Sequence, residues 1–347
     1  MPDADPQPFD AVLLVSFGGP ERPEDVLPFL ENVARGKPIP RQRLLEVAEH
    51  YHQFGGKSPI NDQNRALIGA LEAELASHGL NLPIYWGNRN WRPLLTDALA
   101  QMGADGVRRA LALFTSAFSS YSSCRQYLEN IAAAQAELGP TAPRVDKLRA
   151  FYNHPGFIAA MTQCVREAFG RVPADGRAAA RLLYTAHSIP LAMAANCRYE
   201  AQLLEACRLV SQGLDRPAWD LVYQSRSGPP TQPWLEPDVA DRLRELAAAG
   251  VRDVVLAPIG FVSDHLEVHY DLDTEARRLC GELGVHMVRA ATVGTHPRVI
   301  AMYRELIQER IGLHAERPAL GPFGPSHDVC AADCCLSGRR YTSRGRK

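Results

Sequence analysis

The stretch AGVRDVVLAPIGFVSDHLEVHYDLD, residues 249–273, passes from a turn through an apolar run into a dense group of ionisable side chains. The run predicts a buried strand, followed by a loop and a helix. Ligands of parallel α/β sheets bind beyond the carboxyl ends of the strands, where Asp264, His265, Glu267 and Asp271 are expected. Glu267 and Asp271 are four residues apart and predict one helix face, with Asp264 a turn earlier. Such crowding favours a site for a proton, a metal ion or a cation, and a solvated helix start is the alternative.

The same order of turn, strand, polar loop and helix occurs in DGVRRALALFTSAFSSYSSCRQYLENI, residues 105–131. Short β-branched runs alternate with helical patterns along the chain, which is typical of parallel sheets with crossover helices. We expect an α/β fold with two similar Rossmann-like domains, each a four-stranded parallel sheet flanked by helices. The expected domains cover residues 1–151 and 152–312, and a tail covers 313–347. The expected strands cover residues 10–17, 82–88, 109–115, 145–151, 181–187, 220–225, 253–260 and 285–290.

Composition narrows the class of protein. The chain has 347 residues, of which 46% are hydrophobic and 22% charged, so it can bury a sizeable core. A net charge of −1 argues against a general nucleic-acid binder. No apolar run approaches the roughly 18 residues that span a bilayer, and Met1–Asp10 lacks the features of a signal peptide. We therefore expect a cytoplasmic protein without an integral membrane segment.

His187 ends the apolar run RLLYTAH, at the same edge of the predicted sheet as Glu267. A lone histidine is usually structural, but one that opposes acids at a neighbouring strand end is a candidate base or metal ligand. His265 and His269 are four residues apart, yet the HExxH zinc pattern is absent. We expect His265 to support the site and His269 to be exposed.

Seven segments carry a resemblance to one enzyme family: TAHSIP (185–190), YQSRSGPPTQPWLEPDV (223–239), IGFVSDHLEVHYDLD (259–273), VLLVSFGGP (12–20), FGGKSPI (54–60), YWGNRNW (85–91) and TSAFSSYSSCRQY (115–127). Together they resemble the ferrochelatases, which insert ferrous iron into a porphyrin, over about residues 10–311. They are most similar to the bacterial coproporphyrin-type enzymes. The resemblance implies two Rossmann-like domains with the porphyrin in the cleft between them and Fe²⁺ as a substrate.

The resemblance implies that His187 and Glu267 bind the metal and handle protons, with Asp271 as a second acid. The chemistry suits these residue types, because a porphyrin must lose two N–H protons as a divalent metal enters. Two positions depart from some relatives: Phe17 replaces a tyrosine whose oxygen approaches the metal, and His50 replaces an arginine. The implied porphyrin contacts are Ser58, Tyr127, Phe17, Tyr51 and Trp234, whose aromatic members could grip and bend the ring.

Three of the eight cysteines, Cys330, Cys334 and Cys335, crowd into six residues of the tail. A reducing cytoplasm disfavours disulfides, and thiolate ligation suits both iron–sulfur clusters and zinc, while the absence of any metal is a third alternative. Some ferrochelatases hold a [2Fe-2S] cluster by one cysteine of the body and three near the C-terminus. The resemblance therefore implies a [2Fe-2S] cluster on the tail cysteines, with Cys164 as the body ligand.

We expect insertion of Fe²⁺ into coproporphyrin III in haem biosynthesis. The alternatives are a protoporphyrin IX ferrochelatase, a cobalt or nickel tetrapyrrole chelatase and a non-catalytic tetrapyrrole carrier. Transient contact with enzymes of the haem pathway is also expected. Basic residues are predicted to rim the cleft and to favour four carboxylates over two, unless they form a solvated face. They are Arg35, Lys37, Arg41, Lys57 and Arg89.

Overall fold

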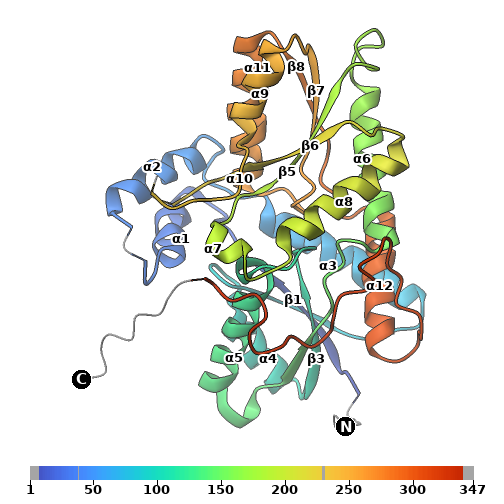
Figure 1. The fold of residues 1–347 in the computed structure, drawn as a ribbon. Helices are drawn as coiled ribbons and strands as arrows, with labels where there is room; N and C mark the ends of the chain where they lie inside the picture. Colours follow the sequence, from blue (N-terminus) through green and yellow to red (C-terminus); the bar gives the residue numbers. More distant parts are fainter. Residues whose placement is uncertain (1–7, 38, 229–230, 339–347) are drawn as a thin grey trace.

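Two four-stranded parallel sheets form the centre of the protein, in a computed structural model that describes residues 8–37, 39–228 and 231–338. The strand orders are β2-β1-β3-β4 and β6-β5-β7-β8, so the second sheet repeats the topology of the first. This confirms the predicted pair of similar α/β halves, which lie one above the other in Figure 1. The strands are β1 (Ala11–Ser16), β2 (Ile84–Asn88), β3 (Arg109–Phe114), β4 (Arg144–Lys147), β5 (Arg181–His187), β6 (Trp219–Gln224), β7 (Asp253–Ala257) and β8 (His286–Arg289).

All eight predicted strands form, and two of them, β4 and β7, are three residues shorter than expected. β7 ends at Ala257 rather than at residue 260, because the next residue, Pro258, has no N–H to donate to a neighbouring strand. β4 ends at Lys147 instead of residue 151. Both strands therefore end earlier than predicted, and the loops that follow their carboxyl ends are longer.

Helices flank the sheets, and two of them, η2 and η4, are π-helices with one extra residue per hydrogen-bonded turn. The helices are η1 (Pro23–Asp25), α1 (Val26–Val33), α2 (Arg41–His52), α3 (Ile60–Ser77), α4 (Leu95–Ala104), η2 (Tyr121–Arg125), α5 (Gln126–Leu138), η3 (Gly139–Thr141), α6 (Pro155–Gly170), α7 (Leu191–Ala194), α8 (Tyr199–Leu214), α9 (Val239–Ala248), α10 (Leu266–Val268), η4 (His269–Ala276), α11 (Arg277–Leu283) and α12 (Pro297–Arg310). No helix in the described ranges is long and apolar enough to cross a membrane.

Strand alternation explains how the core is built. Successive side chains point to opposite faces of a sheet, so Leu14 enters one cluster of apolar residues and Leu13 another. The cluster that contains Leu14 also contains Tyr184 of β5, and thus a single core joins the inner faces of both sheets. The division of the chain at residues 151 and 152 stays a prediction, because this core crosses it.

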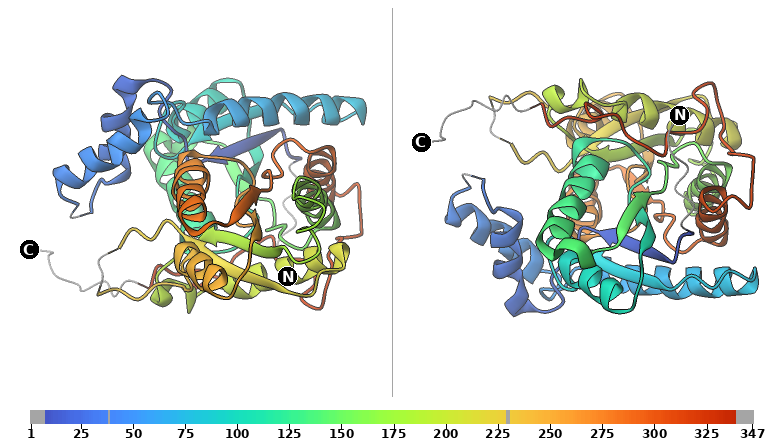
Figure 2. Two further views of the ribbon diagram at one scale, coloured as in Figure 1. Left: turned by 90° about the horizontal axis from the view of Figure 1, so that it is seen from above. Right: turned by 90° about the horizontal axis from the view of Figure 1, so that it is seen from below.

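Helices α1 and α2 form a hairpin that projects from the body in both views of Figure 2. The hairpin has a small apolar cluster of its own, whose buried members are Val26, Phe29, Leu30 and Ala48. Phe17, Tyr51 and Trp91 pack against this cluster, so the hairpin is joined to the first sheet through aromatic side chains.

The tail after α12 has no helix or strand up to residue 338, and residues 339–347 lie outside the described ranges. Polar contacts nevertheless fix its path along the body (Figure 1). The buried Arg149 guanidinium pairs with Glu309 at 2.8 Å and donates to the carbonyl of Pro318, while the amide of Asn153 donates to Leu320 and Gly324. The tail is therefore held by hydrogen bonds before any metal is considered.

Candidate active site

His187 and Glu267 meet at the carboxyl ends of β5 and β7, as the sequence predicts. The His187 Nε2 lies 3.7 Å from a Glu267 carboxylate oxygen. The His187 Nδ1 lies 2.5 Å from the carbonyl oxygen of Ser188, which can only accept, so Nδ1 carries a proton. In the neutral ring Nε2 therefore keeps its lone pair and faces Glu267, ready to take a proton or to bind a cation.

Asp271 lies beside this pair and is held by the end of β6. The Gln224 side-chain amide and the Ser225 hydroxyl both donate to one carboxylate oxygen of Asp271. Ser225 has φ +61°, a left-handed backbone that a serine rarely adopts and that costs free energy. Burial, and the nearby charge of Glu267, raise the pKa of Asp271 to about 6. Asp271 can therefore gain or lose a proton near neutral pH.

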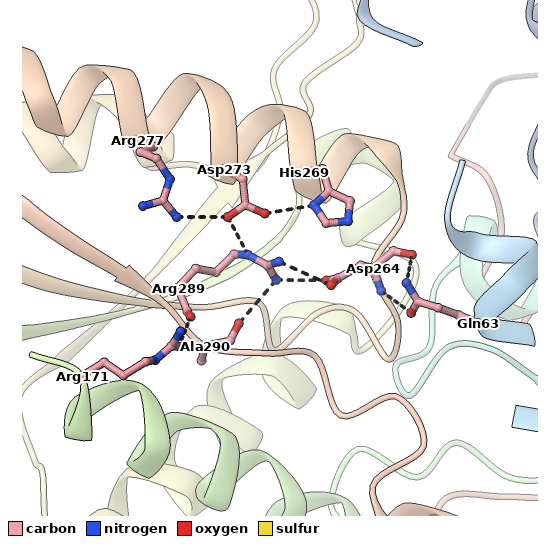
Figure 3. A network of polar contacts seen from close by, with 8 residues as sticks. All are labelled: Gln63, Arg171, Asp264, His269, Asp273, Arg277, Arg289 and Ala290. Atoms are coloured by element: carbon pink, nitrogen blue, oxygen red, sulfur yellow. Dashed lines mark hydrogen bonds and ion pairs between the residues drawn. The ribbon is translucent and has the colours of Figure 1, made fainter. Parts of the chain in front are cut away.

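The segment that carries these acids is not the plain helix that the spacing predicted. Glu267 lies in the short α10, whereas Asp271 lies in the π-helix η4, an element often found at functional sites. Asp264 does not join them, because its carboxylate is bound at 3.0 Å by the guanidinium of Arg289 (Figure 3). The expectation of three crowded carboxylates is thus corrected to two.

The two histidines of this segment differ in their surroundings. His265 is near Glu267, with 3.9 Å between its Nδ1 and the carboxylate, and burial lowers the pKa of its ring. His269 was expected to be exposed, but it is half-buried and its Nδ1 lies 3.0 Å from the carboxylate of Asp273 (Figure 3). His265 therefore adjoins the reactive pair, and His269 belongs to the network around Asp273.

Helix α2 lies against this segment from the first half of the chain. The His50 ring stacks on Tyr270 with centroids 3.9 Å apart and an angle of 9° between the planes. Burial, and the charge of Glu267, raise the pKa of Tyr51 well above its ordinary value. Side chains from both halves of the chain therefore converge around Glu267.

The expected porphyrin contacts divide into two groups. Phe17 and Tyr51 are half-buried and pack against the hairpin cluster. Ser58, Tyr127 and Trp234 are buried, with at most 8% of each residue exposed, and the Tyr127 ring packs at a tilt against Phe114 in the core of the first sheet. Their role as porphyrin contacts stays a prediction, as does that of Phe17 and Tyr51.

Arg89 follows β2 and is the most enclosed of the five basic residues expected at the cleft. Its guanidinium lies 5.9 Å from the centre of the Phe17 ring, and burial lowers its pKa. In the described ranges no carboxylate pairs with it, whereas Lys57 is paired with Asp62 at 2.5 Å. A half-buried cation without a carboxylate partner in the described ranges is suited to an anionic group of a ligand.

Comparison with known proteins agrees with this arrangement. Residues 9–311 match the family described as Ferrochelatase. The chain belongs to the ferrochelatase family.

Its relatives include "Ferrochelatase" of Rhodopirellula baltica, 58% identical over 97% of this chain and 95% of the relative. "Coproporphyrin III ferrochelatase" of Streptomyces griseus is 54% identical over 95% of this chain and 94% of the relative. Among solved structures, SirB from Bacillus subtilis with Fe³⁺ is similar with a TM-score of 0.55 and 11% identity, over 87% of this chain and 95% of that chain. The last likeness confirms the two-domain α/β fold alone.

This ferrochelatase gathers four cysteines and a histidine where the tail passes η2. The Sγ atoms of Cys334 and Cys335 are 3.6 Å apart, and the Cys334 Sγ is 3.7 Å from His327 Nε2. The ligand atoms of His327, Cys330 and Cys334 all lie within 4.8 Å of one another. The thiol of Cys335 is hydrogen-bonded to that of Cys124 in η2. These residues form the cysteine site.

The body cysteine at this site is Cys124, and not Cys164 as expected. Cys164 is buried on α6, where burial and the charge of Glu167 on the same helix raise its pKa to about 11. The hydrogen bond with Cys335, together with the charge of Lys147, lowers the pKa of Cys124 to about 7 despite burial. The structure thus brings Cys124 to the tail cysteines, and ligation by Cys164 stays a prediction.

Sequence reasoning missed several residues that shape the site. Gln224 and Ser225 stand in the segment YQSRSG. The signal that could have placed them at the site is their position at the end of β6, which pairs with β5. Cys124 stands in SSYSSCRQY, about 200 residues before the tail cysteines, and no local spacing relates it to them. Gln63 and Arg289 carried no local signal, because their partners are distant in the sequence.

Asp271→Asn is expected to raise the melting temperature at pH 7 while it lowers activity. The folded pKa of about 6 exceeds the ordinary 3.8, so the folded state binds more protons and loses stability as pH rises between these values. Above pH 6, ionisation of the buried Asp271 lowers the free energy of unfolding by about 3 kcal/mol at most, and the variant does not carry this cost. Thermal melts of both proteins from pH 4 to pH 8 measure it.

Asp273→Asn is the matched control with the opposite sign. Burial alone would raise its pKa, but bonds from His269 and Arg289 lower it to about 2, so its ionised form stabilises the fold above pH 4. This variant should melt earlier at pH 7. A lower melting temperature for Asp271→Asn at pH 7, unchanged by pH, would contradict the assignment for Asp271.

Proposed function

We propose that this chain inserts ferrous iron into coproporphyrin III in haem biosynthesis. The observation that carries the proposal is the opposition of His187 and Glu267 at 3.7 Å, with Asp271 beside them. The name of the Streptomyces griseus relative, at 54% identity, supports the choice of porphyrin. Iron is a substrate here, delivered to the ring and released with it.

The proton traffic follows from the protonation states of the site. His187 Nε2 accepts a proton from a pyrrole N–H, since its other ring nitrogen is fixed as a donor to Ser188. Glu267 has a side chain that is 53% exposed and can pass protons to solvent or hold the incoming cation. Asp271, with its pKa of about 6, exchanges protons at the operating pH. The proton acceptor His187, the relay Glu267 and the exchangeable acid Asp271 thus lie next to one another.

Electrostatics supports a porphyrin with four carboxylates. Arg89 is a half-buried cation near Phe17, and two exposed arginines lie on the hairpin, Arg35 between α1 and α2 and Arg41 at the start of α2. Coproporphyrin III presents four propionates, whereas protoporphyrin IX presents two. Each charge-assisted hydrogen bond to a desolvated guanidinium contributes about 1.5–3 kcal/mol, so an added pair favours coproporphyrin.

His187→Ala and Glu267→Gln should each reduce iron insertion at least a hundredfold, because the base or its relay is lost. Porphyrin affinity should change less than twofold, since neither side chain grips the ring. Anaerobic assays with ferrous iron measure turnover by absorbance, and fluorescence titration measures porphyrin binding. His78→Ala, on the exposed end of α3, is the control and should keep full activity. Near-normal turnover in either variant would overturn the mechanism.

Arg89→Met should lower kcat/KM for coproporphyrin III about tenfold and lower it less for protoporphyrin IX, because one charge-assisted contact to a propionate is lost. Both porphyrins are compared in anaerobic assays with ferrous iron. Lys57→Met is the control, as this lysine is already paired with Asp62. Equal specificity of the unaltered protein for the two porphyrins would contradict the proposed substrate.

We also propose a [2Fe-2S] cluster held by Cys124, Cys330, Cys334 and Cys335. Adjacent cysteines can ligate together only where the chain turns sharply, and Cys335 has φ +56° within such a turn. Two cationic side chains lie close to the cysteine site. The charge of Lys147 lowers the pKa of Cys124, and the Arg125 guanidinium donates hydrogen bonds to the carbonyls of Ala332 and Cys334. Their charges suit a thiolate-ligated centre, which is anionic.

Cys124→Ser should bleach the visible charge-transfer bands of anaerobically purified protein and lower its iron and sulfide content from two of each per chain. Cys164→Ser is the matched control and should keep both the colour and the two irons, because Cys124 is the body cysteine that hydrogen-bonds to a cysteine of the tail. Bleaching by Cys164→Ser, or a colourless protein that contains zinc, would contradict the ligand set.

A further inference from the structure

Arg289, the last residue of β8, binds both ends of the segment that carries the acidic residues of the site. Its Nη1 lies 3.0 Å from the Asp264 carboxylate, and its Nε lies 2.9 Å from the Asp273 carboxylate (Figure 3). The side chain is 13% exposed, so these charge-assisted bonds form largely out of water. Asp264 precedes Glu267 by three residues, and Asp273 follows Asp271 by two. One guanidinium therefore spans the whole segment 264–273.

Gln63, in the first turn of α3, ties the same segment to the other half of the protein. Its side-chain oxygen accepts from the backbone N–H of Asp264 at 2.8 Å, and its amide nitrogen donates to the carbonyl of Asp264 at 3.0 Å. The side chain thus pairs with both backbone groups of one residue (Figure 3). Gln63 and Arg289 fix Asp264 from opposite sides, one at the backbone and one at the carboxylate.

The segment needs this support, because its own structure is weak. α10 has three residues, and η4 has π-helical hydrogen bonding, so neither element is stable alone. Among the described residues, the ring nitrogens of His187 and His265 lie 3.7 Å and 3.9 Å from the Glu267 carboxylate, both beyond ordinary hydrogen-bond length. The backbone of the segment therefore sets where Glu267 stands relative to His187.

We propose that Arg289 and Gln63 are positioning residues for metal insertion, which hold Glu267 against His187 by fixing the segment 264–273. The inference rests on the proposed role of Glu267. Neither side chain contacts the porphyrin or the metal in this role. A displacement of about 1 Å in a reacting group can cost on the order of a hundredfold in rate, so the loss of either support is expected to be visible in kcat.

The test compares Arg289→Met, Arg289→Lys and Gln63→Leu with the unaltered full-length protein. Each should lower kcat for iron insertion at least tenfold, while the KM for coproporphyrin III and the porphyrin Kd change less than twofold. Lysine is not a rescue, because its single ammonium cannot bridge two carboxylates. Gln63→Leu leaves the buried ion pairs intact and keeps the test valid if the arginine variants fold poorly. Arg277→Met is the control: Arg277 also bonds to Asp273, at 3.4 Å, but is exposed and should keep full kcat.

A double variant separates positioning from general damage. In the Glu267→Gln background, whose residual turnover is measured over long incubations, Arg289→Met should cost no more than a further twofold. The inference would be overturned if the losses of kcat from Arg289→Met and Glu267→Gln multiplied in the double variant, or if porphyrin affinity fell in parallel with kcat. Either result would leave the role of Glu267 intact. Near-normal turnover of Glu267→Gln alone would instead overturn the proposed function.

Discussion

Parallel pairing of β5, β6 and β7 is the constraint on which the site depends. It places the carboxyl ends of neighbouring strands at one edge of the sheet, and the chain leaves that edge with His187, Ser225 and, after a loop, Glu267. Parallel strands also require helices on both faces, which bury the sheet and leave that edge as the place for polar groups. The reactive pair is a consequence of this topology rather than of any local motif.

The second requirement is that irregular elements be held from outside. The π-helix η4, the left-handed Ser225 and the short α10 are each costly or weak by themselves. They persist because Arg289, Gln224 and Gln63 satisfy their polar groups from β8, β6 and α3. Regular structure around the site thus offsets its local instability. It also keeps Asp271 buried, and this burial raises the pKa of its carboxyl.

Much of the fold could be predicted because its signals are local. Apolar runs gave all eight strands, and the repeated GVR turn indicated two halves of one topology. His187 and Glu267 were found for the same reason, as His187 ends one predicted strand and Glu267 follows the loop after another. Long-range packing could not be predicted in this way. Asp264 looked like a third active-site acid until its partner Arg289, 25 residues later, was known.

The cysteine site shows the same limit. Cys164 and Cys124 are both compatible with a fourth ligand from sequence alone, and only the path of the tail decides between them. That path depends on Arg149, Asn153 and Lys147, which bind tail carbonyls 167 to 180 residues away. The burial of Ser58 and Tyr127 could likewise not be predicted, because it depends on residues that are distant in the sequence.

The core shared by the two sheets has a mechanical consequence. Leu14 and Tyr184 belong to one packed interior, so swinging the halves apart would expose apolar area at about 25 cal/mol per Å² and disrupt close packing. The α1–α2 hairpin, by contrast, has a cluster of four buried side chains and meets η4 through the stack of His50 on Tyr270. Displacing the hairpin would therefore disturb far less packed apolar surface than separating the two halves.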